Sequence, residues 1–165
     1  MKTCCISILF GVLALFGLSA QSQPDVKVRV VNFTADWCPS CRIFDPRLHK
    51  ALDELNDPSF EQISIDLTVT KTGSMDQRTK FWDGLPGYLE TRHIGRLHSG
   101  FMGFRNTGYA VVIAADTQEP LFCTMGPIAV EDLKFGLLEA KRRVVERKPH
   151  DRVPEGADCP PSYLN

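Results

Sequence analysis

Residues 33–46 read FTADWCPSCRIFDP and contain the pattern that decides the fold. This stretch continues an apolar segment, residues 26–34, which alternates at first and then becomes continuously apolar, as a buried strand does. Downstream, apolar residues recur at helical spacing over residues 44–55. Cys38 and Cys41 are therefore predicted to lie between a buried strand and the first turn of a helix.

Two cysteines separated by two residues at the start of a helix share one face of the turn, so their sulfur atoms can form a disulfide. Cys38 would face the unpaired amides and the positive pole of the helix, which stabilise a thiolate and lower its pKa below the usual value of about 8.5. We therefore predict Cys38 as the attacking thiol and Cys41 as the thiol that resolves the mixed disulfide. Pro39 suits the first helical position, because its missing N–H costs nothing there.

The same stretch resembles the thioredoxin family. The shared features are a strand followed by W-C-x-x-C from Trp37, a basic residue directly after the second cysteine, and a proline five residues beyond it, Pro46. The resemblance covers roughly residues 26–147 but is specific only across residues 31–46. It implies an α/β, thioredoxin-like fold, a redox-active disulfide between the two cysteines and no organic cofactor. The run TADWCPSC is also similar to the thioredoxin-like domains of bacterial transmembrane thiol reductases.

The remaining segments predict the order strand, helix, strand, helix or loop, strand, strand, helix, which implies a mixed central sheet with helices on both faces. A helix over residues 75–94 is expected to be broken at Gly84, Pro86 and Gly87. The other predicted elements are a strand over residues 60–69, a hairpin of residues 109–115 and 121–125, and a final helix over residues 130–144.

Two positions depart from the family in side-chain charge. Where the family buries an Asp six residues before the first cysteine, this chain has Asn32, and Gln62 stands where a Lys commonly pairs with that Asp. An amide side chain does not titrate. The resemblance therefore implies that this pair no longer assists proton transfer to or from the resolving thiol, Cys41. We therefore expect the resolving step to be slower.

The family also has a cis-Pro just before the hairpin, beside the active cysteine. Thr107 and Gly108 occupy that place here, and we expect a trans peptide, since a cis bond without proline costs about 2.5–4 kcal/mol. The alternative is that Pro86 lies in this loop, although the residues after it make a poor buried strand. Between the cysteines, Pro39-Ser40 is neither the Gly-Pro typical of reducing thioredoxins nor the Pro-His of strong oxidants, so the direction of exchange stays open.

The N-terminal segment predicts export to the periplasm or secretion. Residues 2–20 are one Lys followed by a run without charges that ends in small residues, the outline of a secretory signal. A membrane anchor is the alternative, although the 17 uncharged residues are at or below the roughly 17–25 that span a bilayer. We expect a signal peptide over residues 1–22, a thioredoxin-like domain over 23–148 with an insertion around 70–107, and a flexible Pro-rich tail over 149–165.

The six cysteines divide by position. Cys4 and Cys5 lie in the predicted signal peptide, Cys123 lies in a predicted strand and Cys159 lies in the predicted tail. In an oxidising compartment two leftover thiols are a liability, so a structural Cys123–Cys159 disulfide is a reasonable hypothesis. The alternative for Cys123 is a small buried hydrophobe.

The charge balance restricts the class of partner. With 19 Lys and Arg against 20 Asp and Glu, a net charge of −1 gives no electrostatic reason to expect nucleic acid or an anionic membrane as the main partner. The expected partners are protein thiols or disulfides, including a membrane thiol reductase or oxidase. We expect a monomer, with no membrane span after signal cleavage.

Two functions remain as hypotheses. The first is an exported thiol–disulfide oxidoreductase that takes part in cell redox homeostasis. The alternative is a non-catalytic thioredoxin-like module that binds a metal, copper or zinc, or a protein partner. A zinc site needs four ligands and the two cysteines supply two, so a metal site would need further ligands such as His93 and His98. We assign no metal ligands.

Overall fold

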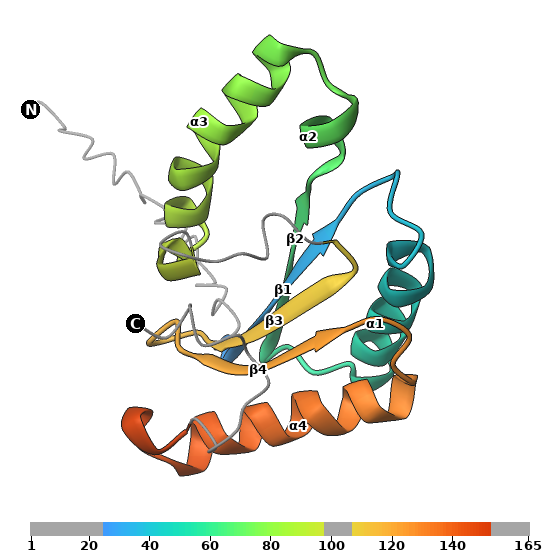
Figure 1. Ribbon diagram of the computed structural model, residues 1–165. Coiled ribbons are helices and arrows are strands. Elements are labelled where there is room, and N and C mark those ends of the chain that lie inside the picture. The colour runs from blue at the N-terminus through green and yellow to red at the C-terminus, as the bar shows by residue number, and fades with distance from the viewer. Residues whose placement is uncertain (1–24, 98–106, 153–165) are drawn as a thin grey trace, which may run out of the picture.

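The computed structural model describes residues 25–97 and 107–152, which form a four-stranded sheet with helices on both faces (Figure 1). The order of strands across the sheet is β2-β1-β3-β4. β1 pairs parallel with β2 and antiparallel with β3, and β3 pairs antiparallel with β4. The expected mixed sheet is confirmed. The strands are β1 (Val28–Thr34), β2 (Phe60–Asp66), β3 (Tyr109–Ala114) and β4 (Pro120–Met125).

Two helical layers cover the sheet and enclose two separate cores. Helices α1 and α4 pack on one face, where their apolar side chains meet Val28 and Val30 of β1. On the other face, α3 packs over Val31 and Phe33 of β1. The helices are α1 (Cys41–Leu55), α2 (Thr68–Thr72), α3 (Met75–Thr91) and α4 (Val130–Glu146), with single 3-10 turns at Gly95–Leu97 and Pro149–Asp151.

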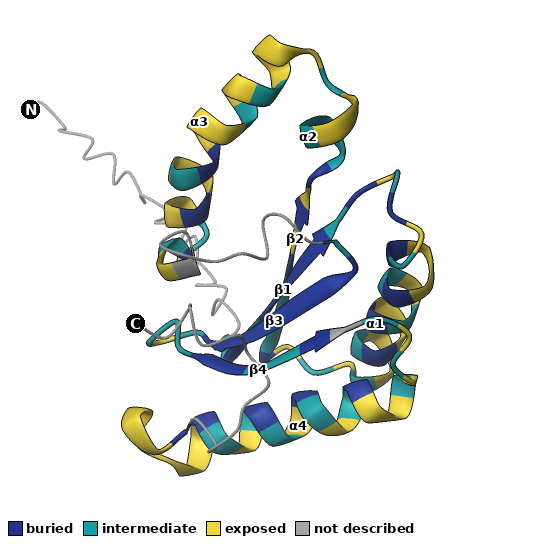
Figure 2. Ribbon diagram, viewed as in Figure 1, coloured by how far each residue is buried: buried dark blue, intermediate teal, exposed yellow. Residues whose placement is uncertain are grey.

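The central strands are buried almost completely. Five of the seven residues of β1 and all six of β3 are buried, as the dark ribbons of Figure 2 show. A strand with both faces covered reads as a continuous apolar run, which is the pattern the sequence shows before the cysteines. β1 therefore holds its last residue, Thr34, at a fixed place from which the cysteine-bearing turn begins.

The predicted break in the helix after residue 75 is wrong. α3 continues through Gly84, Pro86 and Gly87 to its end at Thr91. A proline inside a helix removes one backbone hydrogen bond, and glycine costs about 1 kcal/mol relative to alanine. Burial of Leu85 and Leu89 against the sheet offsets these local costs and keeps the helix continuous.

The second predicted strand is also too long at its end. β2 stops at Asp66, whose carboxylate accepts a hydrogen bond from the backbone N–H of Thr68 at 2.8 Å. This contact turns the chain out of the sheet and into the short helix α2. The expected strand residue Val69 is consequently helical, and Thr68 is brought toward the turn that follows β1.

The ordered domain extends beyond the predicted start of the tail. Residues 149–151 form a 3-10 turn, and the side chain of Arg152 is buried. Its guanidinium forms an ion pair with Asp116 at 2.7 Å and donates a hydrogen bond to the backbone oxygen of Val144 at 3.1 Å. The hydrogen bonds from Arg152 lower the pKa of Asp116 below its usual value. The rest of the predicted tail and the predicted signal peptide lie outside the described residues.

Within residues 25–97 and 107–152, none of the helices is both long and apolar enough to cross a membrane.

Asp57 connects the turn after α1 to α4. Its carboxylate accepts hydrogen bonds from the ammonium of Lys141 and from the backbone N–H and hydroxyl of Ser59, the last two at 3.0 and 2.6 Å. These contacts, the one from Lys141 first, lower the pKa of Asp57 from 3.8 to about 2. Folding therefore stabilises the ionised form of the Asp57 carboxylate.

We expect Asp57→Asn to lower the free energy of unfolding by about 1–2 kcal/mol at pH 7, since one pKa unit corresponds to about 1.4 kcal/mol before solvent screening. Because folding depresses this pKa, the stabilisation is present above the unfolded value of 3.8 and is lost as the pH falls toward about 2. Urea unfolding of both proteins at pH 7 and pH 2.5 measures the difference. The exposed Asp83→Asn is the control, and an undiminished difference at pH 2.5 would contradict the assignment.

Candidate active site at the start of helix α1

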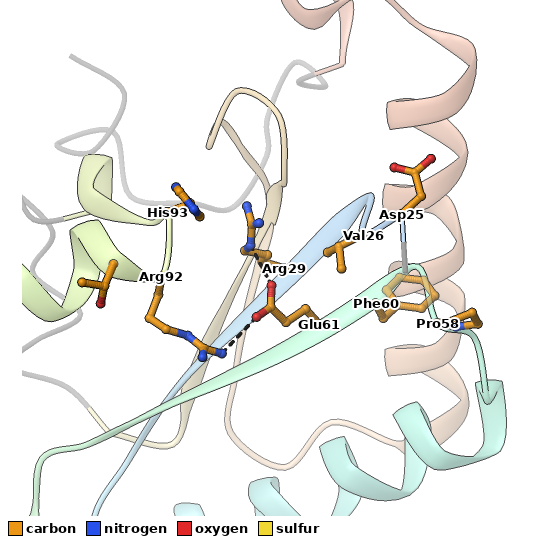
Figure 3. A pocket seen from close by; sticks show the side chains of 9 residues that line it. Asp25, Val26, Arg29, Pro58, Phe60, Glu61, Arg92 and His93 are labelled. Carbon is orange, nitrogen blue, oxygen red and sulfur yellow. Dashed lines mark hydrogen bonds and ion pairs between the residues drawn. The ribbon is translucent and has the colours of Figure 1, made fainter. Parts of the chain in front are cut away.

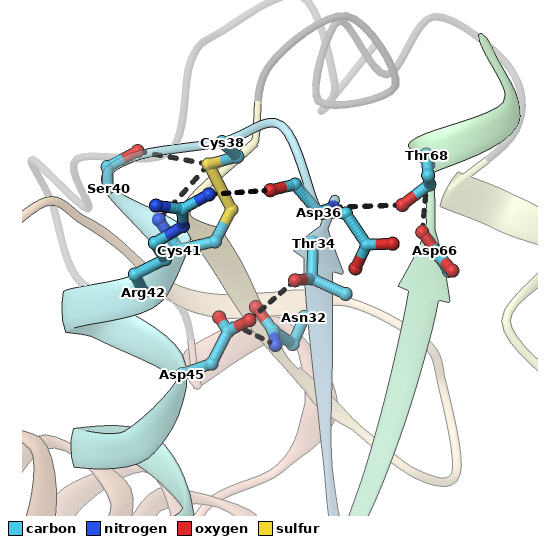
Figure 4. The surroundings of a disulfide bond; sticks show 10 residues. All are labelled: Asn32, Thr34, Asp36, Cys38, Ser40, Cys41, Arg42, Asp45, Asp66 and Thr68. Atoms are coloured by element: carbon cyan, nitrogen blue, oxygen red, sulfur yellow. Dashed lines mark hydrogen bonds between the residues drawn. A yellow bond between two sulfur atoms is a disulfide. The ribbon is translucent and has the colours of Figure 1, made fainter. Parts of the chain in front are cut away.

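Cys38 and Cys41 are joined by a disulfide, with their Cα atoms 5.3 Å apart (Figure 4). A turn after β1 positions the first cysteine, whose N–H donates to the oxygen of Ala35 at 3.0 Å. The helix begins at Cys41, so the expectation that Pro39 is the first helical residue is wrong by two positions. The reason is that the carbonyl of Ser40 accepts the first helical hydrogen bonds, which makes Ser40 the N-cap.

Two hydrogen bonds converge on the sulfur of Cys38. The backbone N–H of Cys41 lies 3.1 Å from Cys38 Sγ, and the hydroxyl of Ser40 lies 3.2 Å from it. A disulfide sulfur carries no proton, so the Ser40 hydroxyl is the donor. When the disulfide is reduced, both donors face the same sulfur, and hydrogen bonds to the charged form lower the pKa of a thiol. The arrangement therefore favours a thiolate at Cys38.

The position of Ser40 depends on Gly108, just before β3. Gly108 has a φ of +70°, and a Cβ atom on it would lie 2.4 Å from Ser40 Oγ. Its N–H donates to the oxygen of Phe33 at 2.9 Å, which fixes this approach. None of the peptide bonds in the described parts of the chain is cis, so Thr107 and Gly108 are joined by a trans bond. Glycine thus leaves room for the Ser40 hydroxyl beside Cys38 Sγ.

The turn that carries Cys38 is tied to α2 through Thr68. The Thr68 hydroxyl accepts a hydrogen bond from the backbone N–H of Asp36 at 2.9 Å, and its carbonyl accepts one from Trp37 Nε1 at 3.2 Å. The ammonium of Lys71 lies 4.5 Å from the centre of the Trp37 ring. Sequence reasoning did not identify Thr68, because a threonine after a strand belongs to no motif.

Both cysteines are buried, with 1% of Cys38 and 3% of Cys41 exposed. Trp37 is half-buried and packs against the same core cluster. Exchange with an external thiol therefore requires the groups around Cys38 to move.

A carboxylate from α1 lies beneath the disulfide and is held by β1 (Figure 4). Asp45 accepts hydrogen bonds from Asn32 Nδ2 at 3.2 Å and from the Thr34 hydroxyl at 2.5 Å. Asn32 is 1% exposed, and its Oδ1 has no hydrogen-bond partner in the described structure. The site thus contains an ionisable side chain next to the amide at position 32. Sequence reasoning gave Asp45 no role, although its spacing of four residues from Cys41 was visible in the motif.

The other residues singled out from the sequence lie on α1, β2 and β4. Pro46 is exposed within α1, and Gln62 lies on β2 with its amide 3.4 Å from the Ser64 hydroxyl. Cys123 is half-buried on β4, packs against the core cluster that includes the cysteine pair, and is disulfide-bonded. The predicted pairing of Cys123 with Cys159 lies outside the described residues and stays a prediction.

A separate cavity of about 930 Å³ opens near the first residues of β1 and β2 (Figure 3). Glu61 lies between two guanidiniums there, 2.8 Å from Arg29 and 2.9 Å from Arg92. His93 lines this cavity, whereas the cysteine pair follows the last residue of β1. His93 therefore lies at the opposite end of the sheet and does not join the cysteines as a metal ligand. Within the described residues, no three His, Cys, Asp or Glu side chains are grouped to hold a metal ion.

Comparisons with known proteins agree with this architecture. The sequence model of the thioredoxin family matches residues 19–80. Thioredoxin H2 of Arabidopsis thaliana is 40% identical over 40 residues, which is 24% of this chain and 30% of that protein. Thioredoxin of Mycoplasma genitalium is 38% identical over 37 residues, which is 22% of this chain and 36% of that protein. The chain thus matches about a third of the length of these curated relatives.

Matches among solved structures include StoA from Bacillus subtilis, at a TM-score of 0.45 and 15% identity over 68% of this chain and 83% of that one. Trxlp from Edwardsiella tarda has a TM-score of 0.41 and 14% identity over 71% of this chain and 87% of that one. The family match covers β1, the cysteine pair, α1 and β2, and these elements occur here in a mixed sheet with the pair at the start of a helix. The chain is thus similar to the thioredoxin family over residues 19–80, the segment that contains the cysteine pair.

Proposed function

We propose that this chain is an exported thiol–disulfide oxidoreductase that exchanges disulfides with protein thiols through Cys38 and Cys41. The observation that supports this most directly is the disulfide at the start of α1, in which Cys38 Sγ accepts hydrogen bonds from Cys41 N–H and the Ser40 hydroxyl. The same donors would stabilise a Cys38 thiolate after reduction. A pair with one activated sulfur is suited to repeated exchange.

In the reducing direction, the Cys38 thiolate attacks one sulfur of a substrate disulfide and displaces the other sulfur as a thiolate. Cys41 then attacks Cys38 Sγ, the mixed disulfide breaks and the second substrate sulfur leaves reduced. The protein is left with the Cys38–Cys41 disulfide found in the structure. The reverse sequence oxidises a substrate dithiol, and the reduction potential of the pair against its surroundings sets the direction.

The sequence supports a location outside the cytoplasm. An uncharged run followed by small residues precedes the domain, and disulfides persist in oxidising compartments. We propose that the mature protein is periplasmic or secreted and that a membrane thiol reductase or oxidase resets the pair. The near-zero net charge implies that partners are recognised by local contacts around Cys38 and not by a long-range field.

Replacing the resolving cysteine should trap substrates. We expect Cys41→Ala to accumulate mixed disulfides through Cys38 when the protein is incubated with a disulfide-containing protein such as insulin, because the second attack cannot occur. Non-reducing electrophoresis followed by peptide mass analysis measures the adduct, and dithiothreitol should remove it. The matched double variant Cys38→Ala, Cys41→Ala should give no adduct at this site. A wild-type pair that never cycles and a Cys41→Ala protein that traps nothing would exclude the proposed activity.

Removing the Ser40 hydroxyl should make the pair more reducing. The hydroxyl stabilises the reduced, thiolate form, so we expect Ser40→Ala to shift the reduction potential to more negative values by about 30–60 mV, the equivalent of one hydrogen bond to a charged group. Equilibration with glutathione buffers at pH 7 measures the shift. Ser40→Thr keeps a hydroxyl and serves as the control, and a potential shifted equally in both variants would argue against the hydrogen bond as the cause.

Gly108→Ala should affect both stability and redox potential. The substitution places a Cβ at a positive φ and 2.4 Å from Ser40 Oγ, so we expect a loss of about 1–3 kcal/mol in unfolding free energy and displacement of the Ser40 hydroxyl. Gly126 has a φ of +76° with open space around it, so Gly126→Ala carries the backbone cost alone. Thermal unfolding should show a larger loss of stability for Gly108→Ala than for Gly126→Ala. Glutathione equilibration should show a shift in reduction potential for Gly108→Ala only.

A further inference from the structure

We propose that Asp45 accepts the proton that leaves the Cys41 thiol when Cys41 resolves the mixed disulfide. This inference rests on the proposed exchange activity and assigns its acid–base group. Asp45 follows Cys41 by four residues on α1, and side chains at that spacing are neighbours on a helix, with Cβ atoms roughly 5–6 Å apart. In Figure 4 the carboxylate lies below the disulfide, between α1 and β1.

The carboxylate is held in place by side chains from a second element. The Thr34 hydroxyl donates to one oxygen at 2.5 Å, and Asn32 Nδ2 donates to the other at 3.2 Å. Both donors belong to β1, the strand that ends just before the cysteine-bearing turn. Since both oxygens of Asp45 are bound, the carboxylate is oriented and does not rotate freely as a solvated surface carboxylate would.

Asn32 is the second polar side chain beneath the sulfur of Cys41. An ionised carboxylate only accepts hydrogen bonds, so the Asn32 amide must present its NH₂ group to Asp45. Its Oδ1 is then left buried, without a hydrogen-bond partner in the described structure, while the cysteines are oxidised. Reduction creates an S–H donor on Cys41, which suits this acceptor. Asn32 thus holds the carboxylate in place, and the proton passes directly from Cys41 to Asp45, since an amide does not relay a proton.

Resolution moves one proton and exchanges one disulfide for another. The Cys41 thiol gives its proton to the Asp45 carboxylate, and the resulting thiolate attacks Cys38 Sγ. The bond between Cys38 and the substrate sulfur breaks, and that sulfur leaves as a thiolate with the electron pair. The two cysteines are oxidised to the disulfide, the substrate disulfide is reduced, and Asp45 releases its proton to water. Asp45 on α1 therefore accepts the proton that the amide of Asn32 on β1 cannot accept.

The test separates attack by Cys38 from resolution by Cys41. Reduced protein is mixed with excess glutathione disulfide and quenched with acid at timed intervals, and the glutathione adduct on Cys38 is quantified by peptide mass analysis. The rise of the adduct measures attack and its decay measures resolution.

We expect Asp45→Asn to leave the rise of the adduct unchanged and to slow its decay by about 10- to 100-fold. A general base commonly accelerates such a step by roughly 100-fold or more. The exposed Asp53→Asn on the same helix should change neither phase. An Asp45→Asn protein whose adduct decays at the wild-type rate would overturn the proposal.

A transposed variant distinguishes proton transfer from a structural role. Asn32→Asp combined with Asp45→Asn keeps an amide facing a carboxylate but moves the charge to the strand, so we expect the decay to return to within about threefold of wild type. A decay that stays slow in this double variant would assign Asp45 a structural role and overturn the proposal.

If Asp45→Asn does not fold, Asp45→Glu replaces it, since it keeps the charge but displaces the carboxylate. A decay in that variant that is not at least about threefold slower would also overturn the proposal. A wild-type protein that forms neither the adduct nor the Cys38–Cys41 disulfide, or whose adduct never decays, would instead remove the exchange activity on which the inference rests.

Discussion

The burial of β1 on both faces is the constraint from which the rest of the structure follows. Val28 and Val30 enter the core under α1 and α4, and Val31 and Phe33 enter the core under α3. A slip of one residue would exchange these side chains between the two cores, so the register of β1 against its neighbours is strongly specified. The chain therefore leaves the sheet after Thr34 at a fixed point, and the cysteine pair begins its turn there.

Most of the fold could be predicted from periodicity because its elements are amphipathic or fully buried over several residues. The errors occur where a single contact decides the outcome. β2 ends early because the Asp66 carboxylate binds the Thr68 amide, and α3 remains whole because Leu85 and Leu89 are buried on the sheet. Arg152 extends the ordered domain because its guanidinium forms an ion pair with Asp116, which is distant in sequence. Such contacts leave no periodic signal.

The site could be predicted to the extent that it is local. Cys38, Cys41 and the turn between them follow from spacing at the start of a helix, whereas the contacts that tune them join distant segments. Gly108 meets Ser40 only because β3 pairs beside β1, and Asp45 meets Asn32 only because α1 packs on that strand. An Asn at position 32 looks like the loss of a charge in the sequence alone. In the structure, it lies beside a carboxylate from another element.

The link between Thr68 and the turn at Asp36 and Trp37 has a mechanical consequence. α2 is the first part of the segment between β2 and β3, and it is joined through a short connection to the long helix α3. A force or a bound partner that displaces α3 would reach the turn before Cys38 through two hydrogen bonds, one from the backbone of Asp36 and one from the Trp37 indole, without contact with either cysteine. Sequence variation in this segment can therefore adjust how readily the buried sulfur is uncovered, independently of its reduction potential.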